Sequence, residues 1–372
     1  MEKYLSIRIQ TALYISIFFI SLHHVFVYLT NSSILRYTFN LQTAEVISIY
    51  GLASLFGICI YLILLKRGLT NNIKTNIYTT TLIEILCLIS MYYSSIHGYV
   101  YAFIGLFFVH HLLTPYILFN LDTLFETYTH IKDRGKSRGI YLTAWNIPFI
   151  IVPIIMSTLS VSKLSIVYLA SSALLLPFIF FIFTYTKDPG NIRDTEIADK
   201  PNNDLLKLLR NFFKDKLDRN SFIVQCCLHL YYGSLAIILP IYLHSVFKFE
   251  WDKIGLILAA MTMPFILIQI PFGNIEDKKH NERFLFKVGI LITILATILT
   301  LLVRPNIGED ISFLLLMTFL FLSHVGCSLI EISIESRFYK HITERDHTAL
   351  LIFRVARIFP YSLGILAILF IV

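Results

Sequence analysis

Long apolar segments are the feature of this sequence that most constrains its fold. Runs of apolar residues alternate with short polar loops, and each run is long enough to cross a bilayer, which takes about 20 helical residues. The composition agrees, because 56% of the 372 residues are hydrophobic and only 15% are charged. Eleven runs are therefore predicted as membrane helices, at roughly residues 9–30, 43–65, 75–96, 99–121, 139–160, 164–186, 221–246, 252–274, 284–303, 310–332 and 348–372.

The basic residues predict how the chain is oriented. Lys and Arg are retained on the cytoplasmic side of short loops. Most of the 31 Lys and Arg residues fall on one side when the N-terminus is placed inside. We therefore expect a multi-pass protein of the cytoplasmic (inner) membrane with a cytoplasmic N-terminus. The same distribution accounts for the net charge of +7, so no nucleic-acid partner is expected.

An internal repeat emerges when the chain is shifted by about 209 residues. Asp122 and Glu126, four residues apart, then align with Glu331 and Glu335, which are also four apart. A repeat of this size predicts two parallel six-helix bundles.

The repeat divides the chain into three parts. We expect an N-terminal six-helix bundle at 1–186, a cytoplasmic linker at 187–220 and a C-terminal bundle at 221–372. The linker has one apolar stripe opposed by charged residues, which is typical of an amphipathic helix on a membrane surface, although a passive linker remains the alternative. The stripe consists of Leu205, Leu208, Leu209, Phe212 and Phe213.

A short motif between the eighth and ninth predicted helices carries a family resemblance. The segment IPFGNIEDKK places Gly273, Asp277 and Lys278 in a Gly-x-x-x-Asp-Arg/Lys pattern. Together with the two halves and the basic central loop, it resembles the major facilitator superfamily. The resemblance implies an all-α fold and a secondary active transporter or uniporter. Such a protein moves a small organic solute by alternating access, and proton coupling is one option.

Two features depart from the family pattern. Gly68 stands where the acid of the first-half motif is expected, and the repeat places the twelfth helix at Val372, the last residue. We therefore expect eleven helices and a missing twelfth, with a homodimer as one way to cover the exposed face. A truncated copy of a longer chain is the alternative.

The resemblance also implies a cytoplasmic latch, in which Asp277 approaches the start of the fifth helix near Arg138. Asp122 and Glu126 are expected to pair with Lys66 or Arg67. Arg354, deep in the eleventh helix, is expected to pair with Glu331 or Asp122. The alternative is that these residues only anchor helix ends at the membrane surface. The latch candidates are Asp122, Glu126, Arg138, Gly273, Asp277, Lys278, Glu331, Glu335 and Arg354.

Six histidines lie well within predicted helices, on the first, fourth, seventh and tenth only. The resemblance implies that these four helices line a central cavity for solute or protons, whereas separate hydrogen-bonded histidines are the alternative. The cavity candidates are His23, His24, His110, His111, Trp145, Asn146, Gln225, His229, His324 and Arg357. Glu84 lies in the third helix, so we interpret it as a protonated structural residue rather than a coupling site.

Enzyme motifs are absent from the sequence. It has no Walker loop, no His-Glu-x-x-His helix and no Gly-x-Ser-x-Gly elbow, and we expect neither a cofactor nor a metal. The alternatives to a transporter are a non-transporting membrane sensor or assembly partner and, less favoured, a membrane-embedded transferase.

Overall fold

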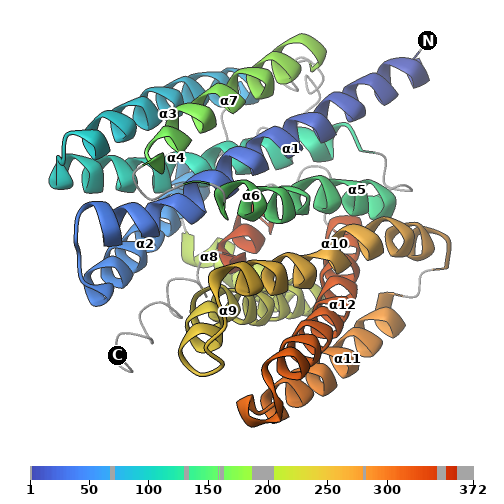
Figure 1. Cartoon of the computed structure of the whole chain (residues 1–372). Coiled ribbons are helices and arrows are strands. Elements are labelled where there is room, and N and C mark those ends of the chain that lie inside the picture. The colour runs from blue at the N-terminus through green and yellow to red at the C-terminus, as the bar shows by residue number, and fades with distance from the viewer. Residues whose placement is uncertain are drawn as a thin grey trace. The chain divides into compact units, whose positions relative to one another are not determined.

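The computed structural model of the chain describes residues 2–67, 72–129, 134–157, 159, 163–186, 205–279, 282–341 and 349–357. Within these residues the secondary structure is helical, with no strand (Figure 1). The helices in chain order are α1 (Glu2–Ser33), η1 (Ile34–Thr38), α2 (Thr43–Arg67), α3 (Ile73–Ile96), α4 (Val100–Thr127), α5 (Arg134–Asn146), α6 (Pro148–Ser157), α7 (Ile166–Tyr185), α8 (Leu205–Lys214), α9 (Lys216–Ser245), α10 (Trp251–Lys279), α11 (Glu282–Leu302), η5 (Pro305–Ile307) and α12 (Glu309–His341).

Eight helical segments among the described residues are long and apolar enough to cross a membrane, so the protein is a multi-pass membrane protein. They are Arg8–Thr38, Ile73–Ile96, Val100–Thr127, Arg134–Met156, Ile166–Tyr185, Asp252–Asp277, Arg283–Leu302 and Glu309–His341. The predicted second span contains a shorter apolar helix, Ala44–Cys59. The predicted seventh span falls on α9. Most of the predicted eleventh lies outside the described residues, as does the place of a twelfth. Eleven spans, the 209-residue repeat, the choice of membrane and the orientation remain predictions.

Two local signals end helices as the sequence requires. Gly98 has φ +73° between α3 and α4, a left-handed conformation that glycine adopts without steric cost. Pro148 is the first residue of α6, a position where the missing N–H of proline has no helical partner to lose. The predicted fifth span thus corresponds to one apolar segment, Arg134–Met156, which a turn at Ile147 divides into α5 and α6.

The described helices form two compact units, which we treat separately. Unit 1 contains the described parts of Met1–Thr129, Ser160–His229 and Ile342–Val372, and unit 2 those of His130–Leu159 and Leu230–His341. α5 and α6 thus contact helices of unit 2, whereas the predicted boundaries at 186 and 221 place them in the first half. The division of the chain into an N-terminal bundle, a linker and a C-terminal bundle remains a prediction.

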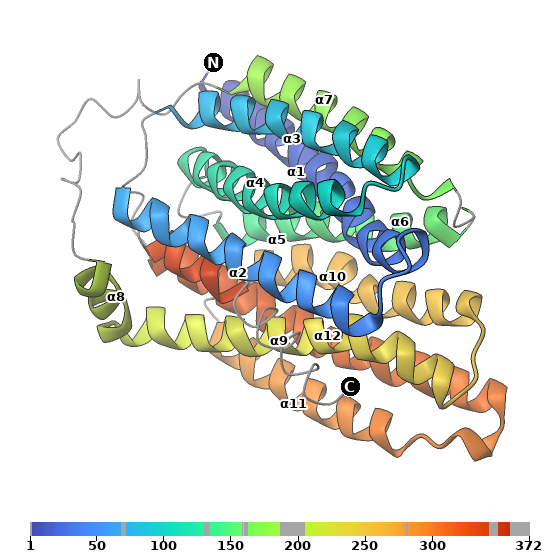
Figure 2. The same ribbon diagram turned by 90° about the vertical axis from the view of Figure 1, so that its left-hand side faces the viewer.

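In unit 1, α1 packs along α7, and α3 packs against both α4 and α7 (Figures 1 and 2). The apolar side chains between them are fully enclosed, for example Leu13, Ile17, Leu88 and Phe107. The predicted amphipathic helix is α8, in which Phe212 is buried and Leu206 is 78% exposed.

In unit 2, α12 packs against α11 and α10, and α10 packs against α5. Glycines allow the closest of these approaches. A Cβ added to Gly139 would lie 2.4 Å from the carbonyl oxygen of Gln269, and one added to Gly273 would lie 2.4 Å from that of Gly135. Small residues four apart let membrane helices approach at backbone distance, and the stretch Gly135–Gly139 provides this pattern on α5.

Large apolar side chains are exposed on several of the described helices. On α11 these side chains are half exposed or more, which suits a surface that contacts lipid tails. They are Phe284, Leu291, Ile294, Leu295, Leu301 and Leu302. Contact with lipid accounts for this face, and a homodimer that covers it stays a prediction.

Candidate functional site

Asp277 lies at the N-terminus of α5 in unit 2. Its Oδ1 accepts the backbone N–H of Gly135 at 2.9 Å, and its Oδ2 accepts that of Lys136 at 2.7 Å. The first N–H groups of a helix have no partner within the helix, so a carboxylate is stabilised there by hydrogen bonds and by the helix dipole. Lys340 of α12 adds a positive charge, with its Nζ 3.1 Å from Oδ1. Asp277 therefore holds the start of α5 and the ends of α10 and α12 together.

Arg138 and Arg134 of α5 are buried beside the end of α12. The Arg138 guanidinium carbon lies 3.4 Å from the ring centroid of Tyr339, a cation–π geometry. Its Nε is 3.8 Å from Glu335 Oε2, and both side chains are fully buried. Arg134 donates a hydrogen bond to the carbonyl oxygen of Tyr339. The two arginines thus bind the last turns of α12 through one aromatic residue and one carboxylate.

A chain of amide and carboxylate groups crosses three helices of unit 2. Asn146 of α5 donates from Nδ2 to Gln269 Oε1 at 3.3 Å, and Gln269 of α10 donates from Nε2 to Glu331 Oε2 of α12 at 2.9 Å. Gln269 is fully buried and Glu331 is nearly so. An ionisable residue such as Glu331 is rare inside a membrane protein and is by default a candidate for a substrate or ion pathway.

Asp122 and Glu126, the two acidic latch candidates of the first half of the chain, lie in unit 1. Asp122 forms an ion pair with Arg354, and both side chains are buried. Glu126 is also buried, one turn further along α4. Asp122 is one of the two partners expected for Arg354. The side chain of Lys278 lies outside what the structure describes.

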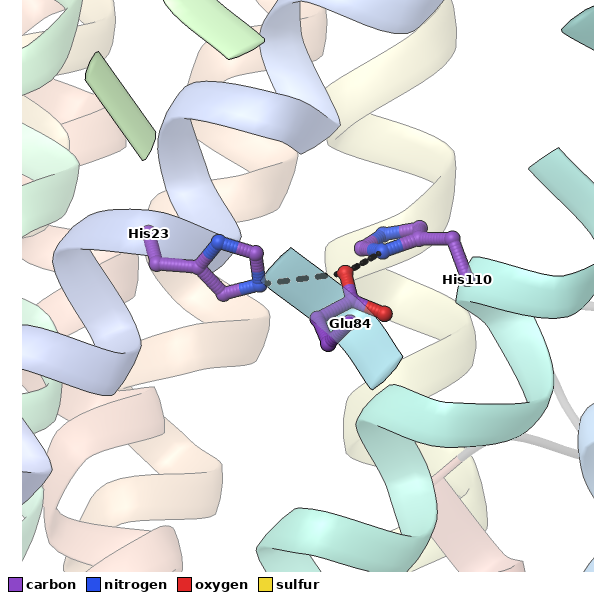
Figure 3. Close-up of side chains that lie close together, drawn as sticks. All are labelled: His23, Glu84 and His110. Atoms are coloured by element: carbon purple, nitrogen blue, oxygen red, sulfur yellow. Dashed lines mark hydrogen bonds and ion pairs between the residues drawn. The ribbon is translucent and has the colours of Figure 1, made fainter. Parts of the chain in front are cut away.

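His23, Glu84 and His110 point toward one another in unit 1, from α1, α3 and α4 (Figure 3). Glu84 Oε1 lies 2.5 Å from His110 Nδ1 and 3.6 Å from His23 Nε2. The other ring nitrogen of His23, Nδ1, contacts Ser171 Oγ of α7 at 2.7 Å. A buried His–Glu–His group can hold protons or a cation, because it combines two neutral bases with one acid.

Three other candidate histidines share one hydrogen-bond pattern. In each, Nδ1 lies at hydrogen-bond distance from the backbone carbonyl four residues earlier. A carbonyl only accepts, so Nδ1 carries the hydrogen and Nε2 is an acceptor. The pairs are His111 with Phe107 at 2.9 Å, His229 with Gln225 at 3.0 Å and His324 with Leu320 at 2.9 Å.

The other cavity candidates are divided between the two units. In unit 1, the His24 ring stacks on Tyr28, Gln225 is fully buried on α9, and Arg357 is half-buried. In unit 2, Trp145 is half-buried on α5. Of the ten candidates, the structure brings His23 and His110 into one cluster, while His324 packs against Tyr232 and Phe265 in unit 2.

Several contact residues escaped the sequence analysis. Gln269 carried a usable signal, since it is a polar residue inside a predicted span and lies two residues before Pro271. Lys340 lies in the basic stretch that follows the predicted tenth helix, and its charge was used only to predict the orientation of the chain. Ser171 and Tyr339 are common residue types in helices, so nothing in the sequence distinguishes them from ordinary packing residues.

The comparison with protein families identifies the class of this protein. The sequence model of the Major Facilitator Superfamily matches residues 13–364, nearly the whole chain. The chain belongs to the Major Facilitator Superfamily, which points to a membrane transporter rather than an enzyme.

Solved structures of transporters have the same fold. The outward conformation of FucP, a Major Facilitator Superfamily transporter, aligns with a TM-score of 0.71 at 13% identity, covering 97% of this chain and 91% of FucP. A bacterial homologue of the iron transporter ferroportin gives 0.70 at 12% identity, covering 98% of both chains. The nucleoside transporter NupG gives 0.64 at 16%, covering 96% of this chain and 90% of NupG. A comparison with curated proteins finds no match.

Proposed function

We propose that the protein is a secondary active transporter or uniporter that moves a small polar or aromatic organic solute across the membrane by alternating access. Transport is either coupled to protons or driven by the solute gradient alone. The observation that supports this proposal best, beyond membership of the family, is the buried chain Asn146–Gln269–Glu331 in unit 2.

Gln269 suits solute binding because its amide retains hydrogen-bonding capacity. A side-chain amide offers two N–H donors and two acceptor lone pairs. Gln269 uses one donor toward Glu331 and one lone pair toward Asn146. The second donor and the second lone pair can bind a hydroxyl or amide group of a solute.

The histidines add acceptors of the same kind. His111, His229 and His324 each hold their hydrogen on Nδ1, so each presents Nε2 as an acceptor. An acceptor nitrogen pairs with a hydroxyl or N–H group, and an imidazole can take up a proton during a transport cycle. Aromatic rings beside His324 supply a surface on which a planar solute can stack.

Uptake into sealed vesicles tests the proposal. The purified protein is first screened for solutes that raise its melting temperature, since a ligand at 100 times its dissociation constant adds about 2.7 kcal/mol of stability. Proteins of similar structure include a fucose:proton symporter, a nucleoside transporter and an organic anion transporter. The first panel therefore holds sugars, nucleosides and organic anions. Uptake of each stabilising solute is then followed in proteoliposomes with and without a pH gradient.

A matched pair of α10 variants assigns the site. Gln269→Leu should lower uptake at least tenfold, because it removes both hydrogen-bonding directions of the amide. Thr262→Val on the same helix should leave uptake within about twofold. Among the described residues, the Thr262 hydroxyl bonds only the carbonyl of Ala259 in its own helix. Stabilisation by a solute without uptake in either direction would favour the sensor or assembly partner instead. Equal uptake by both variants would remove Gln269 from the solute site.

A further inference from the structure

We propose that His23, Glu84 and His110 form a binding site in unit 1 for one divalent first-row transition-metal ion. This proposal does not depend on the proposed transport function, because it is argued from these three side chains alone. The ligand atoms are His23 Nε2, Glu84 Oε1 and His110 Nδ1. All three lie within 4.8 Å of one another.

The spacing of the three atoms fits a common metal centre. Bonds of about 2.0–2.2 Å at a tetrahedral ion place neighbouring ligand atoms about 3.4 Å apart. The distance from His23 Nε2 to Glu84 Oε1 is 3.6 Å. The distance from His110 Nδ1 to the same oxygen is 2.5 Å. Metal binding therefore requires these two atoms to move apart by about 0.9 Å. Small rotations of two long side chains supply that movement.

Ser171 sets the tautomer of His23. The Ser171 hydroxyl donates to the His23 backbone carbonyl at 3.2 Å, which uses its single hydrogen. With the hydroxyl hydrogen in that position, the oxygen accepts from His23 Nδ1, which is 2.7 Å away. With the hydrogen on Nδ1, the lone pair of Nε2 faces the carboxylate. Metal-binding histidines are oriented in this way, by a hydrogen bond from the nitrogen that does not bind the metal.

With Glu84 in its carboxylate form, two acceptors face each other with no hydrogen between them. His23 Nε2 is at 3.6 Å from Glu84 Oε1, too far for a hydrogen bond. Within the described residues, neither Nε2 nor Glu84 Oε2 has a hydrogen-bond partner. A proton on Nδ1 of His110 can serve only the contacts of that nitrogen, namely Glu84 Oε1 at 2.5 Å and Thr114 Oγ1 at 3.3 Å. A cation bound to all three residues satisfies the lone pairs on both sides.

Burial strengthens the case for a cation. His23 and Glu84 are fully buried and His110 is 4% exposed. An ionised carboxylate in such a place is costly unless it is paired or coordinates a metal. On binding, His110 moves its single ring hydrogen from Nδ1 to Nε2 and stays neutral, so the ion bonds to two neutral imidazole nitrogens and one carboxylate oxygen. The net charge of the cluster changes from minus one to plus one.

The donor set selects the class of ion. Imidazole nitrogen suits Zn²⁺, Co²⁺, Ni²⁺ and Fe²⁺, whereas Mg²⁺ and Ca²⁺ prefer sites made entirely of oxygen. Cys87 lies one turn beyond Glu84 on α3, but its thiol is directed to the carbonyl of Leu106 at 3.3 Å. The site therefore has N₂O donors without sulfur. An ion held there would link α1, α3 and α4, with α7 joined through Ser171.

Metal titration of the purified protein tests the site. The full-length protein carries no polyhistidine tag and is stripped with EDTA before Zn²⁺ or Co²⁺ is added. We expect one bound ion per chain by mass spectrometry of the metal, a rise in melting temperature that saturates at one equivalent, and a Co²⁺ absorption spectrum typical of nitrogen ligands. Mg²⁺ and Ca²⁺ should give none of these changes.

Variants locate the ion. Glu84→Gln and His23→Gln should abolish the thermal shift, and Ser171→Ala should weaken binding by about 10- to 100-fold, as loss of an orienting partner does. Two control histidines should leave binding unchanged: His97→Gln, which removes an exposed imidazole at the end of α3, and His324→Gln, which removes a buried one in unit 2.

Two results would overturn the proposal. One is wild-type protein that binds no Zn²⁺ or Co²⁺ and keeps its melting temperature, in which case the cluster holds only protons. The other is binding that His97→Gln removes and Glu84→Gln retains. If the core variants fail to fold, the wild-type Co²⁺ spectrum decides, because a spectrum of oxygen ligands alone contradicts a His–Glu–His site. Uptake of organic solute by metal-free protein remains a separate measurement, so failure here leaves the proposed function standing.

Discussion

The crossing of α5 and α10 gives a prediction whose size follows from the structure. An alanine at Gly273 would place its Cβ 2.4 Å from the carbonyl oxygen of Gly135 and 2.9 Å from its carbonyl carbon. Ordinary contact begins at 3.4 Å, so the helices must separate by about 1 Å at this point. Both atoms belong to backbone, so no side chain can rotate away to make the space.

The cost has three parts. Overpacking of this kind destabilises by about 1–3 kcal/mol. The separation also stretches the bond from Gly135 N–H to Asp277, now 2.9 Å, beyond hydrogen-bond range, which costs about 1.5 kcal/mol for a charged acceptor. Alanine in place of glycine in a helix contributes about 1 kcal/mol in the opposite direction. Gly273→Ala should therefore lose about 1.5–3.5 kcal/mol.

Gly255 provides the matched control on the same helix. A Cβ at Gly255 would meet nothing within 4 Å, so Gly255→Ala should be neutral or stabilising by up to about 1 kcal/mol. Thermal unfolding of both variants in detergent measures the difference. Equal melting temperatures for the two variants would refute the close crossing, and with it the contact between Asp277 and α5.

Three further outcomes are expected. Arg138→Lys should lower stability by about 1–2 kcal/mol in thermal unfolding, because an ammonium cannot reproduce the planar contact of the guanidinium on Tyr339; unchanged stability would contradict that contact. Asp122→Ala should cost about 3–5 kcal/mol by leaving Arg354 buried without its carboxylate, and adding Arg354→Leu should recover most of the loss, whereas additive losses would exclude the ion pair. A cysteine introduced at His97 in a cysteine-free background should react with an impermeant maleimide from outside intact cells, and labelling only after lysis would reverse the predicted orientation.

Membrane-spanning helices could be predicted from the sequence, because they depend on local composition. Apolar length is sufficient to identify α3, α4, α7, α10 and α11 as membrane helices, because an isolated apolar helix needs no information from its neighbours to be recognised. Helix breaks were less visible. Pro148 divides the fifth predicted helix. From sequence alone, a proline inside a long apolar run is equally consistent with a kink and with a break.

The candidate site was predicted only in part, because side-chain partners depend on the relative rotation of helices. His110 and His111 are adjacent and point about 100° apart, and sequence alone does not tell which one faces Glu84. The peripheral place expected for the third helix made Glu84 a structural residue, which stays a prediction, and its contact with His110 was not foreseen. By contrast, the approach of Asp277 to α5 came from the family resemblance rather than from residue chemistry.

The positions of Gln269, Gly273 and Asp277 along α10 connect the Asp277 contact to the proposed solute site. Gln269 precedes Gly273 by four residues and Asp277 by eight, so at about 1.5 Å per residue the three positions lie on one face within about 12 Å. The backbone of Gln269 is itself in close contact with Gly139. A separation of the helices at Gly273 would therefore also shift the amide that joins Asn146 and Glu331. If solute binds Gln269, Gly273→Ala should weaken solute binding as well as stability, while Gly255→Ala should change neither.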